Sequence, residues 1–205
     1  VWYNEPKTLD TAFDVMGDII LSTAAQQYGG FTVPEVDKIL APYAKKSYDK
    51  YISEFMKYSD ESWSGREERA IEYALDKVRR DYDQGWQGIE YKLNTVGSSR
   101  GDYPFVTVTL GLGTEQFEKM CTISLLEVHQ GGQGKAGHKK PVLFPKIVFL
   151  YDKEIHGPGK CCEDIFEAGV ECSSKTMYPD WLSMSGAGYI SSMYKQYKKV
   201  ISPMG

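Results

Sequence analysis

A glycine-rich, basic stretch, GGQGKAGHKK at residues 131–140, has the residue types best suited to chemistry. The backbone amides of such a stretch can bind phosphate oxygens, and Lys135, Lys139 and Lys140 would add positive charge. The stretch does not contain the G-x-x-x-x-G-K-[ST] pattern of a P-loop. Two interpretations stay open at this point: a solvated turn, and a loop that contacts a nucleotide.

Histidine and cysteine positions give little support for a metal site or a nucleophile. No two histidines stand four residues apart, the spacing that places two metal ligands on one helix face; they are His129, His138 and His156. The cysteines contain no C-x-x-C pair, and adjacent cysteines do not easily bind one tetrahedral zinc together; they are Cys121, Cys161, Cys162 and Cys172. We predict reduced thiols, with Cys172 a buried apolar residue rather than a nucleophile. We assign no metal ligand and no catalytic residue.

Composition is that of a soluble globular protein. The 205 residues are 41% apolar and 25% charged, and the net charge of -4 argues against a broad surface for nucleic acid. No apolar run approaches the roughly 20 residues that a bilayer span needs, and no signal-peptide pattern opens the chain. We therefore expect a cytoplasmic protein that binds neither nucleic acid nor membrane.

Three helices are predicted in the first half of the chain. Apolar spacing indicates a helix over residues 8–28, followed by Gly29 and Gly30 as a stop. A second helix begins near Pro34 and runs to about residue 58, either as two segments or with a kink at Pro42. The third, residues 66–96, has a near-heptad repeat; its members are Ile71, Leu75, Val78, Tyr82, Trp86, Ile89, Leu93 and Val96.

The length of this third helix suggests a partner. At 1.5 Å per residue it would extend on the order of 45 Å, which exceeds the core of a small domain. Gly85 and Gly88 lie inside it, where each costs about 1 kcal/mol relative to alanine. We therefore expect another helix to pack closely at both glycines.

The second half alternates strands with helices. Residues 104–111 read as a strand, and residues 142–151, apolar on both faces, read as a buried strand. Helices are predicted over 114–128, with Thr114 as N-cap, and over 161–175, and mixed helix and loop over 189–205. This order predicts an α/β architecture.

Seven stretches in order along nearly the whole chain resemble the catalytic subunit of the anaerobic, class III ribonucleoside-triphosphate reductases, which are glycyl radical enzymes. They are QQYGG (26–30), APYAKKSYDKY (41–51), IEYKLNT (89–95), PFVTVTLGLGT (104–114), LFPKIVF (143–149), ECSSKTMYPD (171–180) and PMG (203–205).

The resemblance implies part of a ten-stranded α/β barrel in which long helices form a homodimer interface. It implies one piece of the barrel domain, with residues 1–96 mainly helical and residues 97–205 supplying barrel strands up to the finger loop. In this family the Pro-Met-Gly sequence leads into the cysteine that carries the thiyl radical, so we expect that cysteine to follow Gly205. None of the four cysteines of this chain matches a reactive thiol, and the fragment alone is expected to be inactive.

The implied activity is reduction of ribonucleoside triphosphates to 2'-deoxyribonucleoside triphosphates for DNA synthesis, with formate or a thiol protein as reductant. The family also implies a glycyl radical, a structural zinc site, and a separate activase that uses S-adenosylmethionine and an iron-sulfur cluster; we expect none of these groups on this chain. By resemblance, the substrate would lie near Gln27, Tyr28, Gly29, Pro203, Met204 and Gly205. A deoxynucleoside triphosphate or ATP effector would contact Lys46, Lys50, Lys77, Arg80 and Gln84.

Simpler interpretations remain for this chain. The charged residues of the two long helices can be a solvated surface. The chain as a whole can be a non-catalytic helical interaction module, or a nucleotide-binding regulatory module on the same scaffold.

Overall fold

The protein contains one four-stranded parallel sheet covered by helices. The computed structural model describes residues 4–27, 29–97, 101 and 103–200. The strands are β1 (Phe31–Val33), β2 (Val106–Leu110), β3 (Lys146–Tyr151) and β4 (Asp180–Ser183), and they lie in that order across the sheet. All three neighbouring pairs are parallel, in the registers Phe31 with Val106, Val108 with Ile147 and Phe149 with Trp181. Each crossover contains helix, as parallel neighbours require.

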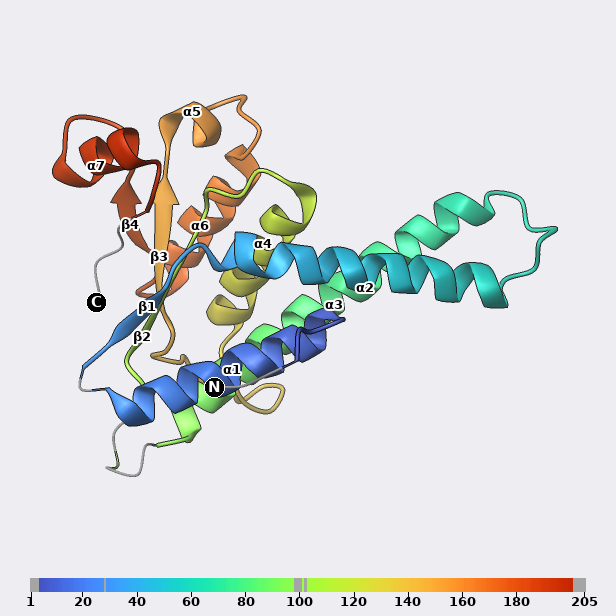
Figure 1. The fold of residues 1–205 in the computed structure, drawn as a ribbon, viewed down its shortest axis with the longest axis horizontal. Helices are drawn as coiled ribbons and strands as arrows, with labels where there is room; N and C mark the ends of the chain where they lie inside the picture. Colours follow the sequence, from blue (N-terminus) through green and yellow to red (C-terminus); the bar gives the residue numbers. More distant parts are fainter. Residues whose placement is uncertain (1–3, 28, 98–100, 102, 201–205) are drawn as a thin grey trace.

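The helices are α1 (Leu9–Gln26), α2 (Val36–Tyr58), α3 (Arg66–Thr95), α4 (Gln116–Gly131), α5 (Lys153–His156), α6 (Glu163–Lys175) and α7 (Tyr189–Tyr197). In Figure 1, α2 and α3 form a long antiparallel hairpin that extends well beyond the sheet, and α1 lies along its near half. The far end of this hairpin is the part of the molecule most distant from the sheet. Among the described residues, no helix has both the length and the apolar character that crossing a membrane requires.

Alternating side chains of the central strand β3 divide between two apolar clusters. Ile147 and Phe149 join the main core, whereas Val148 and Leu150 belong to a smaller cluster with Met184. This follows from the two-residue period of a strand, which points successive side chains to opposite faces. Helices α1 to α4 and α6 contribute to the main core, and residues of α7 pack against the smaller cluster.

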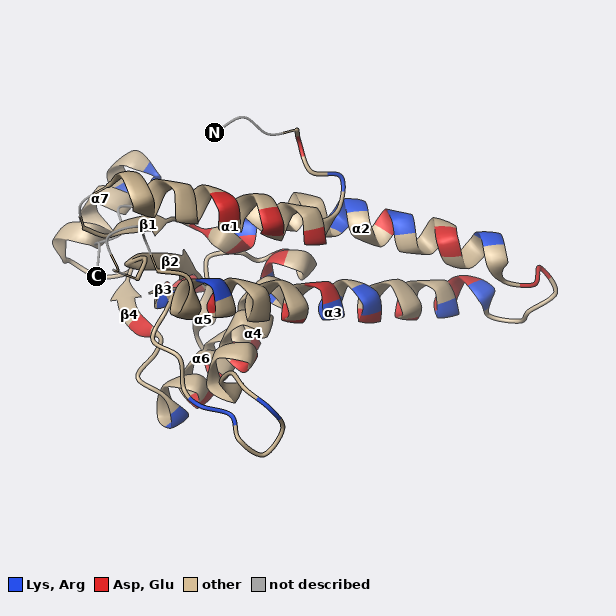
Figure 2. Cartoon of the chain, turned by 90° about the horizontal axis from the view of Figure 1, so that it is seen from below, with Lys and Arg blue, Asp and Glu red and all other residues tan. Residues whose placement is uncertain are grey.

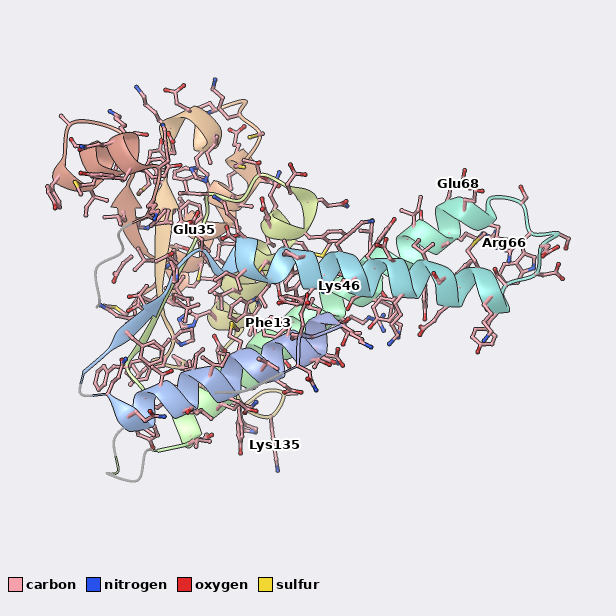
Figure 3. The ribbon with its side chains drawn as sticks, viewed as in Figure 1. Phe13, Glu35, Lys46, Arg66, Glu68 and Lys135 are labelled. Atoms are coloured by element: carbon pink, nitrogen blue, oxygen red, sulfur yellow. The ribbon has the colours of Figure 1, made fainter. Side chains whose placement is uncertain are left out.

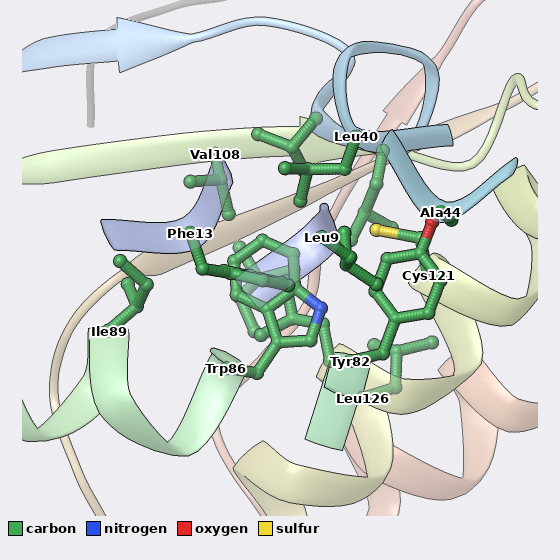
Figure 4. Packing of buried hydrophobic residues seen from close by; sticks show 14 of the residues in the cluster. Leu9, Phe13, Leu40, Ala44, Tyr82, Trp86, Ile89, Val108, Cys121 and Leu126 are labelled. Carbon is green, nitrogen blue, oxygen red and sulfur yellow. The ribbon is translucent and has the colours of Figure 1, made fainter. Parts of the chain in front are cut away.

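Aromatic side chains form the centre of the main core, where α1 crosses α3 (Figure 4). Trp86 and Tyr82 of α3 are fully buried, and Phe13 of α1 meets the Trp86 ring edge-on with 5.0 Å between ring centroids. A Cβ on Gly85 would lie only 2.2 Å from the Phe13 ring, so the glycine makes this crossing possible. The expected close packing is confirmed at Gly85. It is wrong within this chain at Gly88, where a Cβ would meet nothing within 4 Å.

The long helices agree with the sequence pattern except in detail. Helix α3 ends one residue before the predicted boundary. The start of the predicted apolar repeat is wrong, because the first buried positions are Ala70 and Ala74, whereas Ile71 is 44% exposed. The predicted two-segment alternative for the second helix is wrong, because α2 is continuous through Pro42 and starts at Val36 rather than at Pro34.

The cap of α4 differs from the prediction by one residue. Glu115 is the N-cap, and Thr114 precedes it. The Glu118 carboxylate accepts hydrogen bonds from the amides of Thr114 (2.8 Å) and Glu115 (2.9 Å). The Glu118 carboxylate, in the first turn of α4, thus binds the backbone amides of the two residues before this turn. A helix capped at Thr114 would not have this arrangement.

The sequence patterns did not predict three short elements. They are β1, β4 and α5, of three, four and four residues. Because β1 pairs with β2, the mainly helical first part and the strand-containing second part share one sheet.

Candidate functional site

A small cavity lies where α1 crosses α3, and we call it the helix-junction cavity. Its volume is about 170 Å³, and it is lined by Asp10, Phe13, Asp14, Asp81, Gln84, Gly85, Gly88, Ile89 and Lys92. The lining residues of α3 recur at intervals of three and four, which places them on one helix face. Gly88 leaves open space on this face, whereas the space at Gly85 is filled by Phe13. The cavity is therefore open at Gly88 and closed by an aromatic ring at Gly85.

Asp81 links the cavity to α2. Its carboxylate accepts a 2.8 Å hydrogen bond from the hydroxyl of Tyr51. Burial, with a further contribution from the negative charge of Asp10, raises the pKa of Asp81 and outweighs the hydrogen bond from Tyr51 and the positive charges of Lys77 and Lys50, which act in the opposite direction. Burial, together with the hydrogen bond to Asp81, also raises the pKa of Tyr51. This pair connects the two long helices beside the cavity.

The five predicted effector residues divide into two groups. Gln84 lines the cavity, and Lys50 and Lys77 are close enough to act electrostatically on Asp81. Lys46 lies elsewhere on α2, where its ammonium group binds the Glu5 carboxylate at 2.7 Å. Arg80 binds Asp76 at 3.0 Å one turn earlier on α3. The fold thus places three of the five near the cavity or Asp81, although Lys50 also pairs with Glu54 at 3.8 Å, and directs the other two to closer exposed ion pairs.

Charge on the two long helices is mixed, as Figure 2 shows, with basic and acidic residues interspersed along both. In the cavity itself Asp10, Asp14 and Asp81 face a single lysine, Lys92. Like charges repel, so a triphosphate is better accommodated at the lysines outside the cavity than inside it. A neutral group is better suited to the cavity than an anion is.

Two of the six predicted substrate residues, Gln27 and Gly29, lie at the amino end of β1. The Gln27 amide donates to the Thr23 carbonyl at 3.1 Å as α1 ends, and Gly29 has a positive φ of 83°. The next residue, Gly30, lies against Phe105, where a Cβ would be 3.0 Å from the backbone oxygen. The other four, Tyr28, Pro203, Met204 and Gly205, fall outside the described residues.

The glycine-rich stretch forms a turn that uses several of its own amides. Gln133 and Lys140 exchange backbone hydrogen bonds of 2.9 and 2.8 Å, and the His138 amide donates to the Lys135 carbonyl at 2.9 Å. The Gln133 side chain also donates to the buried Glu90 carboxylate at 2.9 Å. Lys135 points away from the body of the protein (Figure 3). These contacts favour the solvated-turn interpretation.

A set of buried side chains that no sequence pattern indicates lies at the carboxyl end of β2. We call residues Gly111–Gly113 the strand-end loop. The buried Asp37 carboxylate accepts hydrogen bonds from the amides of Gly111 (3.0 Å) and Gly113 (3.1 Å). Nε2 of buried His156 donates to the Gly111 carbonyl at 2.7 Å, because its Nδ1 accepts from the Asp152 amide at 2.9 Å. In open α/β sheets, ligands bind beyond the carboxyl ends of strands.

Burial shifts the pKa values of both side chains that bind the strand-end loop, Asp37 and His156. Burial raises the pKa of Asp37, although the amides of Gly111, Lys38 and Gly113 oppose the shift. Burial lowers the pKa of His156, although its contacts with the Gly111 and Asp152 backbone oppose the shift. No sequence signal marked these residues, because Asp37 is 74 residues from Gly111 and His156 is 45 residues from it.

Among the residues that the structure describes, no group of three or more histidine, cysteine or acidic side chains is placed to hold a metal ion. A parallel sheet covered by helices, and a long helical hairpin with the helix-junction cavity beside it, define an α/β protein with a candidate nucleotide-contacting surface.

Comparison with known proteins gives the family. The family model for anaerobic ribonucleoside-triphosphate reductase matches residues 2–205, and the chain belongs to this family. The enzyme of Enterobacteria phage T4 is 35% identical over 98% of this chain, and that of Escherichia coli is 33% identical over 98%. The chain spans 31% and 26% of those two relatives.

A solved structure shares the fold. The anaerobic ribonucleotide reductase of Thermotoga maritima, in complex with dATP and CTP, matches 89% of this chain and 29% of its own length, with a TM-score of 0.55 and 12% identity. At this identity the likeness supports the fold alone.

Proposed function

We propose that this chain is part of the catalytic subunit of an anaerobic reductase that converts ribonucleoside triphosphates to 2'-deoxyribonucleoside triphosphates for DNA synthesis. The observation that carries the proposal is the family match over residues 2–205, supported by the fold it shares with a solved reductase. The chain spans only about a quarter to a third of its relatives' length, so the activity of the whole protein is part of this proposal.

The four parallel strands would form part of a ten-stranded α/β barrel. Strands β1 and β4 are the edges of the described sheet, and an edge strand offers unpaired backbone groups for a further strand. The substrate would approach the amino end of β1, near Gln27 and Gly29, together with Tyr28 and residues 203–205.

The radical chemistry of the family depends on groups that we do not place on the described residues of this chain. A glycyl radical and a cysteine thiyl would supply hydrogen abstraction, and a radical-generating activase would install the glycyl radical. The described residues do not fit a metal site, so zinc and iron-sulfur ligands are not assigned here. What the chain contributes is the sheet scaffold and the helices that carry regulation.

The hairpin of α2 and α3 would form the homodimer interface and the effector site. Lys50 and Lys77 would bind the phosphates of a deoxynucleoside triphosphate or ATP, and Gln84 in the helix-junction cavity would contact the base. Lys46 and Arg80 bind carboxylates at 2.7 and 3.0 Å, closer than the 3.8 Å between Lys50 and Glu54, so we assign them a weaker contribution. Open space at Gly88 would admit the nucleotide or the partner helix.

An apolar groove beside the hairpin also supports the proposal that a second copy of the chain packs against this one. Its volume is about 320 Å³, and its lining includes Met16 and Ile19 of α1, Phe31 of β1 and Ile39 and Tyr43 of α2. Grooves lined by apolar side chains are typical of surfaces that another segment covers.

Lysine substitution tests the effector site directly. In Lys50→Ala/Lys77→Ala, we expect dATP affinity measured by calorimetry to fall by at least about a hundredfold, because two charge-assisted contacts of roughly 1.5–3 kcal/mol each are removed. The matched control is Lys45→Ala/Lys57→Ala, which removes two lysines of α2 that also lie over neighbouring tyrosine rings. An equal loss in both double variants would contradict the assignment.

A further inference from the structure

Cys161 and Cys162, which we call the thiol pair, stand between α5 and α6 with their sulfur atoms 3.6 Å apart. Cys161 is exposed to solvent, whereas Cys162 is fully buried. Burial, with a further contribution from the Cys161 thiol, raises the pKa of Cys162 to about 12. An exposed and a buried thiol side by side therefore differ in access: an oxidant in solution reaches Cys161 first.

The buried member of the pair holds the strand-end loop. The Cys162 thiol donates to the Gly113 carbonyl, with 3.6 Å between sulfur and oxygen. The Gly111 and Gly113 amides are bound by Asp37, and the Gly111 carbonyl is bound by His156. Side chains from three separate segments thus bind all four of these backbone groups. A buried carbonyl that loses its donor is costly, so each of these contacts matters for the loop.

We propose that the thiol pair is an oxidative modification site, converted by hydrogen peroxide into a disulfide between adjacent residues that removes one of the contacts holding the strand-end loop. This inference concerns a property separate from the proposed function, and it stands on the contacts of Cys161 and Cys162 alone.

The chemistry uses one peroxide and balances in two steps. The Cys161 thiolate attacks a peroxide oxygen, an S–O bond forms and the O–O bond breaks, and the displaced hydroxide leaves as water with the proton that the thiol gave up. The Cys162 sulfur then attacks the sulfenic sulfur of Cys161. The S–S bond forms, the S–O bond breaks, and the hydroxyl group takes the Cys162 proton to form a second water. Two thiols are oxidised and one peroxide is reduced.

Disulfide formation changes the loop because it consumes the Cys162 proton. The Gly113 carbonyl then has no donor from Cys162, while the Asp37 and His156 contacts remain. The Cα atoms of adjacent residues are about 3.8 Å apart, shorter than the roughly 4.4–6.8 Å of ordinary disulfides. A disulfide with such unfavourable geometry is easily reduced, so the modification is reversible by a small dithiol.

Mass spectrometry after peroxide treatment tests the modification. The purified protein is treated with hydrogen peroxide, its free thiols are alkylated, and cleavage after Lys160 and Glu163 separates the pair from Cys172. We expect the peptide of residues 161–163 to lose two hydrogen atoms, to escape alkylation, and to recover both thiols after dithiothreitol. Cys161→Ser must abolish this change, whereas Cys172→Ser, at the other end of α6, must leave it intact.

Hydrogen exchange tests the coupling to the loop. Peroxide should speed amide exchange in residues 111–118 of the wild-type protein and of Cys172→Ser, and should leave Cys161→Ser unchanged. Oxidation of Cys161 to sulfinic acid without the disulfide, or a pair that stays fully alkylated, would overturn the proposed site. A disulfide that forms without faster exchange in residues 111–118, or equally faster exchange in Cys161→Ser, would overturn the coupling to the strand-end loop.

Discussion

The near and far halves of the helical hairpin are built differently. Where α3 crosses α1, Tyr82 and Trp86 are fully buried. In the distal hairpin, which we define as residues 51–69, no residue is buried. Its apolar side chains include Tyr58, 79% exposed, and Trp63, 48% exposed. Burial of apolar area is the main source of folding free energy, so the near half stabilises the chain and the distal hairpin extends from it.

The difference indicates where a partner would matter. Apart from the Tyr51 hydrogen bond to Asp81, polar contacts of the distal hairpin are local, such as the Arg66 hydrogen bond to Ser59 at 2.8 Å and, at its near edge, the exposed ion pair of Lys50 with Glu54 at 3.8 Å. Exposed pairs of this kind contribute about 0–1 kcal/mol each. A segment with few buried contacts opens at low free energy unless another surface covers it. This property agrees with the proposed role of the hairpin at a dimer interface.

Two tryptophan substitutions should show the largest contrast. Trp86→Ala removes the fully buried ring beside Phe13 and should lower the free energy of unfolding by about 3–5 kcal/mol. Trp63→Ala removes a half-exposed ring whose contact is Arg69 at 5.7 Å, and should cost at most about 1 kcal/mol. Urea unfolding measures both. Equal costs would mean that the distal hairpin is as well packed as the core.

Two glycines of α3 should respond with opposite signs. In Gly85→Ala the new methyl group would meet the Phe13 ring at 2.2 Å, and overpacking of about 1–3 kcal/mol should exceed the roughly 1 kcal/mol that alanine contributes to a helix. In Gly88→Ala the methyl group meets nothing within 4 Å, so the protein should gain about 1 kcal/mol. Thermal unfolding compares the two, and destabilisation by Gly88→Ala would refute the open space there.

A smaller effect concerns acid stability at the strand-end loop. Because burial places the folded-state pKa of His156 below its ordinary 6.5, the fold favours neutral imidazole. This contribution is fully present above pH 6.5 and is lost as the pH falls through the lowered pKa. His156→Gln keeps one donor and one acceptor but does not titrate, so its stability should depend less on pH in that window. Unfolding curves on both sides of pH 6.5 measure this, and parallel pH dependence would contradict the buried neutral imidazole.

Long periodic elements were predictable from the sequence, and short ones were not. The repeat of apolar residues located α3 to within one residue at its end, because a 30-residue helix contains many turns of the same pattern. Strands β1 and β4 have only three and four residues, and their exposure shows no alternation of buried and exposed positions. An edge strand this short is defined by its neighbour rather than by its own sequence.

The candidate sites show the same limit. The family resemblance, together with residue type, selected the lysines of α2 and α3 as candidates, but it did not predict that Lys46 would bind Glu5, 41 residues away. Asp37, His156 and Cys162 meet at the strand-end loop from positions 74, 45 and 49 residues distant from their loop partners. Such contacts depend on the register of the parallel strands, which local patterns do not determine.

Sedimentation of the protein with and without dATP tests the central claim most directly, because the claim joins nucleotide binding to the pairing of two hairpins. If the effector binds at a dimer interface, dATP must increase the proportion of dimer, and Lys50→Ala/Lys77→Ala must show a smaller increase at the same concentrations. Tight dATP binding by a species that remains monomeric would contradict the account.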